Sequence, residues 1–338
     1  MKRLKIGLNG FGRIGRAFTR IAVKRNTFDL VAVNTRKTPP PMLAYLLQYD
    51  SVYRKFDSKV ETVEDGILID DKKIFSLQTS TPEEIPWDKY GVDLVVDATG
   101  AFLTKEKLLS HIKGSVKKVI VTAPTKDEET THVVLGVNDN QIDWQNETII
   151  SNASCTTNCA APMFKILDDN FKIISGFLTT NHAYTSTQSL LDDANKNPGR
   201  SRAAALNIAP STTGAAEAVA KVIPVLKGKI DGMSLRVPVP TVSFSDISVV
   251  VEKPTTTDEV NQVFKRASEG EMSNILSYET AILVSSDYIG SPYSCTFDAN
   301  YTKVINGNFI KIFGWYDNEW GYSARLVDLV EKLTAYYG

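Results

Sequence analysis

The chain has 338 residues, of which 43% are hydrophobic and 23% charged, and its formal net charge is −1. This length favours two domains, and the balanced charge gives no electrostatic reason to expect a nucleic-acid or membrane partner. No apolar run approaches the roughly 18 residues that span a bilayer, and the first residues lack the apolar core of a secretory signal. Three cysteines are too few for a disulfide framework, which favours the cytoplasm.

The first half of the chain alternates strand-like and helix-like segments. Residues 58–77 have the pattern of hairpins, because Glu64-Asp65-Gly66 and Asp70-Asp71 interrupt an alternation of apolar residues. This rhythm predicts an α/β domain whose parallel sheet is covered by helices. The other predicted segments are strands at 4–9, 30–34, 93–100 and 117–123, and helices at 13–24, 41–48 and 104–112.

The pattern changes from about residue 171. Longer alternating segments predict strands at 232–239, 242–253 and 308–317, and helices are predicted near 214–227 and 257–269. The second half therefore reads as an α+β domain with a mixed or antiparallel sheet, and an amphipathic helix is expected at the C-terminus. The domain boundary falls near residue 153.

Three glycines, Gly10, Gly12 and Gly15, form a G-x-G-x-x-G pattern between the first strand and the first helix. This context is typical of a Rossmann-type dinucleotide site, since the glycines allow a tight turn and let a pyrophosphate approach the helix N-terminus. Glycines that only permit close packing are the alternative. The predicted cofactor-binding residues here are Gly10, Phe11, Gly12, Arg13, Ile14 and Gly15.

The acidic residue that normally follows the second strand of such a site is missing. The strand ends at Asn34, and Thr35, Arg36 and Lys37 follow it. Because a carboxylate would repel the 2′-phosphate of NADP and a cation would bind it, the sequence favours NADP, alone or alongside NAD. The alternative is that Arg36 and Lys37 form a solvated turn before three prolines.

Cys155 stands where a strand-like run at 148–150 gives way to a helix-like run at 160–171. The start of a helix offers free backbone N–H groups and a positive dipole, which favour a thiolate. The alternative is a small buried cysteine in ordinary packing. Its position at the domain boundary favours a reactive role, because pockets concentrate at domain interfaces.

Together, six motifs resemble the glyceraldehyde-3-phosphate dehydrogenase family over essentially the whole chain. The resemblance implies an N-terminal Rossmann-type domain at 1–153, a catalytic α+β domain at 154–318, and a C-terminal helix at 319–338 that packs back on the first domain. It also implies a homotetramer. The motifs are NGFGRIGR, SNASCTTNC, HAYT, STTGAA, RVPVPTVS and WYDNEWGYS.

The resemblance implies that Cys155 is the nucleophile and that His182 is its base. A nearby imidazole favours the thiolate and relays a proton. The other histidines, His111 and His132, have structural interpretations in a helix and at a strand edge. Cys159 is expected to be a packing residue that oxidation could join to Cys155, Cys295 is expected in the core, and no metal site is expected.

By the same resemblance, Thr185 and Arg236 bind the C3 phosphate of the aldehyde. Hydroxyls, backbone N–H groups and an arginine suit phosphate, whereas turn and cap duty is the alternative for the serine and threonines. Residues implied for inorganic phosphate are Ser154, Thr156, Thr213 and Gly214. Residues implied for the cofactor, in addition to the glycine loop, are Asn34, Thr35, Arg36, Thr99, Gly100, Thr122, Asn318 and Tyr322.

The implied reaction is the phosphorylating oxidation of D-glyceraldehyde 3-phosphate to 1,3-bisphosphoglycerate through a Cys155 thioester. The family usually has an acid at Thr35, often has Glu-Arg at Thr79-Ser80, and in strictly NAD-dependent bacterial members often has Leu-Pro at Asp193-Ala194. Asp193 would repel a 2′-phosphate if it pointed inward. The alternatives are erythrose-4-phosphate dehydrogenase and a non-catalytic binding protein on the same scaffold.

Overall fold

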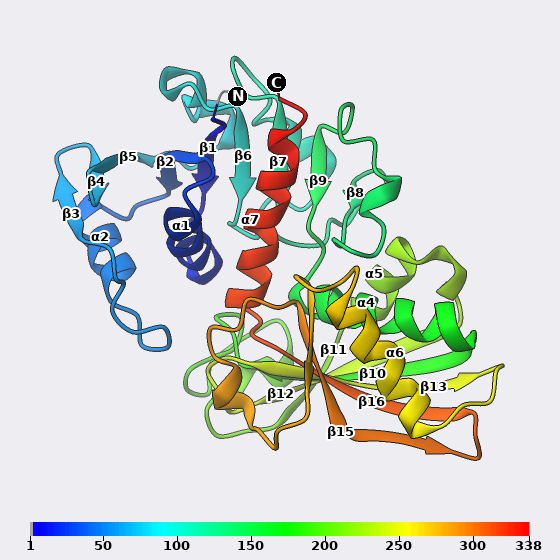
Figure 1. Ribbon diagram of the computed structural model, residues 1–338. Coiled ribbons are helices and arrows are strands. Elements are labelled where there is room, and N and C mark those ends of the chain that lie inside the picture. The colour runs from blue at the N-terminus through cyan, green and yellow to red at the C-terminus, as the bar shows by residue number, and fades with distance from the viewer. Residues whose placement is uncertain (1–2, 338) are drawn as a thin grey trace. The chain divides into compact units, whose positions relative to one another are not determined.

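The structure is a computed structural model that describes residues 3–337, and it divides into two compact units (Figure 1). The first unit contains the chain up to Val133, the segment Gln141–Ala153 and the C-terminal segment from Ser323. The second contains Val134–Asn140 and Ser154–Tyr322. Within the described residues, no helix has the length and apolar character needed to cross a membrane.

The first unit is built on a sheet of order β3-β4-β5-β2-β1-β6-β7-β9-β8. All neighbours pair in parallel except in the β3-β4-β5 meander, which is antiparallel. The predicted parallel sheet and its hairpins are therefore confirmed. The strands are β1 (Lys5–Asn9), β2 (Asp29–Thr35), β3 (Val60–Val63), β4 (Gly66–Ile69), β5 (Lys72–Gln78), β6 (Leu94–Asp97), β7 (Lys118–Val121), β8 (Thr131–His132) and β9 (Ile149–Ser151).

The helices of this unit are α1 (Arg13–Arg25), α2 (Pro40–Gln48), α3 (Lys105–Leu109) and, from Ser323 onward, α7 (Trp320–Thr334). Two predicted elements were too long. The strand at 93–100 ends at Asp97, because the side chain of Asp97 accepts hydrogen bonds from Thr99 and turns the chain out of the sheet. The helix at 104–112 ends at Leu109, and the buried His111 lies in the turn that follows.

The C-terminal helix α7 lies against α1 in the first unit. Arg25, in the last turn of α1, pairs with Asp328 and, at 3.1 Å, with Glu331. The hydroxyl of Thr27 donates to Glu331 at 2.7 Å. The apolar face of α7 is fully buried, as shown by Leu326 and Leu329. Burial and ion pairing together hold the end of the chain in this unit.

The second unit is built on a mixed sheet of order β11-β12-β10-β13-β16-β15-β14. The pairs β10–β12 and β14–β15 are parallel and the others antiparallel, which confirms the predicted mixed sheet. The strands are β10 (Ile173–Ala183), β11 (Ala209–Thr212), β12 (Ile230–Val237), β13 (Ser243–Val251), β14 (Leu276–Glu279), β15 (Cys295–Ile305) and β16 (Phe309–Tyr316). The helices are α4 (Cys155–Phe171), α5 (Ala215–Val222) and α6 (Thr257–Glu269).

Strands β10 and β15 were not recognised from the sequence. Small and polar residues interrupt the apolar alternation of β10, and in β15 the pairing register shifts between Asp298 and Lys303. The helix predicted at 214–227 ends at Val222, because the residue before Pro224 is disfavoured in helical geometry.

Helix α4 approaches the sheet closely at Gly314 on β16. A Cβ atom at Gly314 would lie 2.5 Å from Sγ of Cys295 and 2.7 Å from Met163 of α4. The thiol of Cys159, also fully buried, donates to the Gly314 carbonyl at 3.6 Å. Both buried cysteines are therefore packing residues, and a residue without a side chain sets how closely α4 sits on the sheet.

We expect Gly314→Ala to destabilise the protein by about 1–3 kcal/mol, because the added methyl group overpacks this contact. Urea unfolding would measure the change in free energy. Cys295→Ala in the same chain removes one of the two clashing groups and should recover part of the loss. If the changes in unfolding free energy caused by Gly314→Ala and Cys295→Ala simply add, the contact between positions 314 and 295 would be contradicted.

Candidate active site

Cys155 is the first residue of α4, which begins five residues before the helix-like run at 160–171. Ser154 is the cap: its hydroxyl accepts from the backbone N–H of Thr157 at 3.0 Å and lies 2.7 Å from the Thr157 hydroxyl. Side-chain capping of this kind extends a helix toward its N-terminus. The half-buried thiol of Cys155 consequently stands at the positive end of a 17-residue helix.

His182 comes from the end of β10, 27 residues further along the chain. Its Nε2 atom lies 3.4 Å from Sγ of Cys155, within hydrogen-bonding range for sulfur. Strand β12 pairs in parallel with β10 so that Arg236 is the direct neighbour of His182. The structure thus brings three of the predicted residues, Cys155, His182 and Arg236, into one group.

The hydrogen bonds of His182 assign its tautomer. Nδ1 lies 2.7 Å from the carbonyl oxygen of Ala183, which can only accept, and 3.0 Å from Nη1 of Arg236, which can only donate. Nη1 also donates to the Ala183 carbonyl, at 3.2 Å. Because the contact with the carbonyl is the shorter one and Nη1 has that oxygen as its acceptor, we assign the proton to Nδ1. The lone pair of Nε2 is then left facing the thiol, which is the arrangement a general base needs.

Burial keeps both members of the pair neutral. Burial raises the pKa of the Cys155 thiol to about 11, while the positive charge of Arg236 and hydrogen bonds at Thr156 act in the opposite direction. Burial, reinforced by Arg236, lowers the pKa of His182 to about 3. At neutral pH the site therefore holds a thiol beside an uncharged imidazole that is ready to take its proton.

Tyr316 is a residue of this site that sequence reasoning missed. Its buried hydroxyl bonds to the hydroxyls of Thr156 at 2.9 Å and Thr180 at 2.8 Å. Its ring meets the ring of His182 edge to face, with centroids 6.1 Å apart. Tyr316 ties the first turn of α4 to β10, and its place in the motif WYDNEWGYS was the available signal.

Arg200 is a second residue that the sequence did not reveal. Burial lowers the pKa of both His182 and Arg236, and the positive charge of Arg200 adds to this lowering. Arg200 donates to the hydroxyl of Thr187 at 3.4 Å, and that hydroxyl lies 2.9 Å from the one on Thr185. Among the described residues, the buried Nε atoms of Arg200 and Arg236 have no hydrogen-bond partner. Unpaired guanidinium N–H groups beside hydroxyls suit an anion.

The hydroxyls predicted for inorganic phosphate all have local partners. Ser154 caps α4 and Thr156 bonds to Tyr316. The hydroxyl of Thr213 accepts from the N–H of Ala215 at 3.2 Å. Gly214, next to it, is exposed at the start of α5, with nothing within 4 Å of where a Cβ would stand. Ser154 is therefore a helix cap and Thr213 forms a turn before α5, and both also present oxygen atoms at helix starts.

The first unit has a cleft of about 470 Å³ at the glycine-rich turn. Gly10 has a φ of +100°, and a Cβ there would lie 2.8 Å from the backbone of Ala98. Gly12 has open space where a Cβ would stand, so a phosphate can reach the backbone. A dinucleotide fits this lining. Predicted residues that line the cleft are Gly10, Phe11, Gly12, Asn34, Thr35, Arg36 and Thr99.

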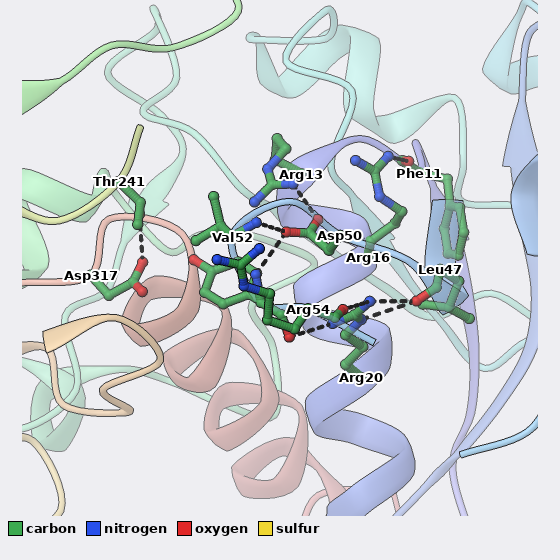
Figure 2. Close-up of polar contacts among 11 residues, drawn as sticks. Phe11, Arg13, Arg16, Arg20, Leu47, Asp50, Val52, Arg54, Thr241 and Asp317 are labelled. Carbon is green, nitrogen blue, oxygen red and sulfur yellow. Dashed lines mark hydrogen bonds and ion pairs between the residues drawn. The ribbon is translucent and has the colours of Figure 1, made fainter. Parts of the chain in front are cut away.

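Arg16 also lines this cleft and was missed by the sequence prediction. Figure 2 shows its guanidinium donating to the carbonyl of Phe11, at 2.8 Å, while the neighbouring Arg13 pairs with Asp50. A residue four positions after Gly12 returns to the same face of α1, which was the available signal.

The other predicted cofactor residues are not among those that line this cleft. Ile14 and Gly15 lie within α1, Gly100 is exposed with a φ of +65° beside Thr99, and the N–H of Thr122 donates to the Asp97 carbonyl at 2.9 Å. In the second unit, the Asn318 amide oxygen accepts from Ser243 at 2.9 Å and Tyr322 is buried.

Asp317, beside Asn318, is also held firmly. It accepts from the Thr241 hydroxyl at 3.0 Å, a contact drawn in Figure 2, and from the Gly290 N–H at 2.8 Å. The backbone that carries Asn318 is thereby fixed. Within residues 3–337, no group of three His, Cys, Asp or Glu side chains is placed to hold a metal ion.

Comparison with known proteins gives one consistent result. Residues 4–105 match the family model of the glyceraldehyde 3-phosphate dehydrogenase NAD binding domain, and residues 154–318 match that of the C-terminal domain. Glyceraldehyde-3-phosphate dehydrogenase 2 of Streptomyces avermitilis is 50% identical over 96% of this chain and 97% of its own. Glyceraldehyde-3-phosphate dehydrogenase of Geobacillus stearothermophilus is 48% identical over 98% of both chains.

We expect Arg236→Gln to move the pH dependence of Cys155 alkylation to higher pH, because the charge that lowers the thiol pKa is removed. Iodoacetamide is the suitable reagent, since it is uncharged and is not itself attracted by the guanidinium. Arg202→Gln, which removes an exposed arginine paired with Asp192, is the matched control and should leave the profile in place. An unchanged profile in Arg236→Gln would contradict the electrostatic role.

Proposed function

The chain belongs to the glyceraldehyde-3-phosphate dehydrogenase family, and we propose that it converts D-glyceraldehyde 3-phosphate and inorganic phosphate to 1,3-bisphosphoglycerate. It is an oxidoreductase that uses NAD(P). The observation that carries the proposal is the contact of 3.4 Å between Cys155 Sγ and His182 Nε2, with Arg236 beside the imidazole. No finding favours erythrose-4-phosphate dehydrogenase or a non-catalytic binding protein.

Cys155 and His182 divide the first chemical step between them. Nε2 of His182 takes the thiol proton as sulfur attacks the aldehyde carbon, which gives a hemithioacetal. The imidazolium gives that proton to the former carbonyl oxygen, which becomes the hemithioacetal hydroxyl. The imidazole then accepts the proton of this hydroxyl as the carbon loses hydride and becomes a thioester. NAD(P), when bound, supplies the acceptor for that hydride.

The second step transfers the acyl group to phosphate. Inorganic phosphate attacks the thioester carbon, the carbon–sulfur bond breaks, and the Cys155 thiolate is released. We propose that Arg236, Thr185 and Arg200 hold the C3 phosphate throughout. Ser154, Thr156, Thr213 and Gly214 are proposed to hold the attacking phosphate, and the helix starts at α4 and α5 favour its negative charge.

The cofactor would occupy the cleft of the first unit. Gly10, Phe11, Gly12 and Thr99 are proposed to hold the pyrophosphate and its neighbouring ribose, with Arg13, Ile14, Gly15, Gly100 and Thr122 shaping the turn and the strand ends. In the second unit, Asn318 is proposed to bond the nicotinamide carboxamide and Tyr322 to lie beside the ring. The roles of Gly10, Phe11, Gly12 and Thr99 rest on the family resemblance together with the lining of the cleft, and the other roles rest on the resemblance alone.

We propose that the enzyme accepts NADP at least as well as NAD. Arg36 is exposed and lines the cleft, and the Thr35 hydroxyl is held in the following turn by the N–H of Thr38 at 3.2 Å. No carboxylate follows β2 to repel a 2′-phosphate. The opposing residue is Asp193, whose carboxylate accepts from the Ala194 N–H at 2.7 Å.

The proposed assembly is a cytoplasmic homotetramer, with residues 1–153 as the cofactor domain, 154–318 as the catalytic domain and 319–338 as a helix returning to the first. Side chains alternate along a strand, so Phe177 and Phe309 lie on the sheet face opposite the buried Leu178 and Ile310. Both phenylalanines are exposed, and Leu206 is 80% exposed. Such apolar surface supports burial against further copies of the chain.

We expect turnover to require phosphate. Without phosphate or arsenate, the enzyme should give a burst of reduced cofactor of one equivalent per site and then stop, because the thioester has no acceptor. Stopped-flow absorbance at the wavelength of the reduced nicotinamide would measure it. Cys155→Ser is the control and should give no burst, because serine is a poor nucleophile at neutral pH. Full steady turnover in phosphate-free buffer would contradict this and indicate hydrolysis.

We expect Thr35→Asp to reverse the cofactor preference toward NAD by repelling the 2′-phosphate. Arg36→Ala should weaken NADP by roughly 5- to 30-fold, the worth of a charge-assisted hydrogen bond, and leave NAD nearly unchanged. Lys37→Ala is the matched control, since Lys37 is exposed but does not line the cleft. The measurement is kcat/KM with each cofactor. A wild-type preference of about 100-fold or more for NAD, some 2.7 kcal/mol, would overturn the proposal.

A further inference from the structure

A buried carboxylate lies under the cofactor cleft and has no part in the mechanism above. Asp97, at the end of β6, is 0% exposed and accepts four hydrogen bonds. Its Oδ1 accepts from the N–H and hydroxyl of Thr99 at 3.1 and 2.6 Å. Its Oδ2 accepts from Asn9 Nδ2 at 2.8 Å and faces His111 Nε2 at 3.2 Å. Asn9 and Thr99 both line the cleft.

The fully buried imidazole of His111 holds this carboxylate in one orientation. The indole N–H of Trp87 can only donate, and it lies 3.1 Å from Nδ1 of His111. Nδ1 is therefore the acceptor, and Nε2 carries the proton that is donated to Asp97. Among the described residues, neither Trp87 nor His111 lines the cleft, so both act on it through their neighbours.

The network continues to Asn34 and Thr79, which also line the cleft. Asn9, whose amide N–H2 group donates to Asp97, accepts from Asn34 Nδ2 at 2.7 Å through its own oxygen. Asn34 exchanges two hydrogen bonds with the backbone of Thr79, at 2.9 and 3.0 Å. One carboxylate thereby links the ends of β1, β2 and β6 and two loops that face the cleft.

We propose that Asp97 and His111 are positioning residues for the cofactor: Asp97 fixes Thr99 and Asn9, and His111 fixes Asp97. The inference rests on the proposed function, since it concerns the cleft assigned to NAD(P). Side chains that are already held in the binding orientation give tighter binding, because no conformational entropy is lost in ordering them when the ligand binds. Loss of the network should therefore lower cofactor affinity in the free enzyme and leave the chemistry at Cys155 intact.

The test is the dissociation constant of NAD and of NADP for the free enzyme, followed by fluorescence quenching. Both carboxylate oxygens of Asp97 accept from donors: Oδ1 from Thr99, and Oδ2 from Asn9 and His111. In Asp97→Asn, either orientation of the amide therefore points its N–H2 group at one of these sets of donors. We expect the dissociation constant to rise about tenfold or more. The rate of Cys155 alkylation without cofactor should be unchanged. The melting temperature of each variant is recorded beside its affinity.

A matched control lies directly before the same strand. Asp93 is also a buried aspartate and accepts from the Lys5 N–H at 3.0 Å, and it does not line the cleft. Asp93→Asn should leave cofactor affinity unchanged even where it lowers the melting temperature. An equal loss of affinity in Asp93→Asn would show a general structural effect and overturn the inference.

If Asp97→Asn does not fold, substitutions at His111 test the same positioning role. His111→Phe keeps a ring beside Phe102, whose own ring meets the imidazole edge to face at 6.3 Å, but removes the hydrogen bonds. His111→Gln keeps one donor and one acceptor. We expect His111→Phe to raise the dissociation constant about tenfold and His111→Gln to restore most of the affinity.

The outcomes separate this inference from the proposed function. If the wild-type chain binds NAD or NADP but His111→Phe binds it equally well, or His111→Gln is no better than His111→Phe, the positioning role is wrong and the proposed function stands. A wild-type chain that binds neither cofactor would overturn both.

Discussion

The contact between the Cys155 thiol and the His182 imidazole is the constraint on which the catalytic unit depends. One partner comes from the start of a helix and the other from the end of a strand, so their distance is set by how α4 sits on the sheet. Gly314 permits the close approach of the helix, and Tyr316 joins its first turn to β10 through Thr156 and Thr180. Helix capping by Ser154 completes the placement of the sulfur.

Burial and the charge of Arg236 have opposite effects on the pKa of the Cys155 thiol and the same effect on the pKa of the His182 imidazole. Burial disfavours both charged forms, raising the pKa of the thiol and lowering that of the imidazole. Arg236 counters the first effect and adds to the second, because a positive charge stabilises a thiolate and destabilises an imidazolium. The resting enzyme therefore keeps a neutral pair, and the same guanidinium that favours ionisation of sulfur is available for the phosphate of the substrate.

Residues that belong to a local motif could be predicted from the sequence, whereas residues brought in by tertiary structure could not. The strands and helices of the first half could be predicted from the periodicity of apolar residues. Cys155 and the glycine turn could be predicted because each lies between a strand-like and a helix-like segment. Arg200 carries no local pattern that specifies a site, and only the packing of distant segments gives it one. Arg16 and Tyr316 lie inside the motifs NGFGRIGR and WYDNEWGYS, but the motifs alone do not specify which of their residues face a site. Strands β10 and β15 were missed because polar residues and a register shift hide their alternation.

The parallel pairing of β10 and β12 has a consequence for how this enzyme can diversify. His182 and Arg236 are register partners, so the separation between the imidazole and the guanidinium is set by the spacing of two adjacent strands. Neither residue can shift along its strand without breaking the ladder, and a slip of one position would turn its side chain to the other face. With the roles proposed for these residues, a family member that accepts a longer aldehyde must gain the extra length from the loops that carry Thr185 and Arg200, because the two strands keep the separation between imidazole and guanidinium constant.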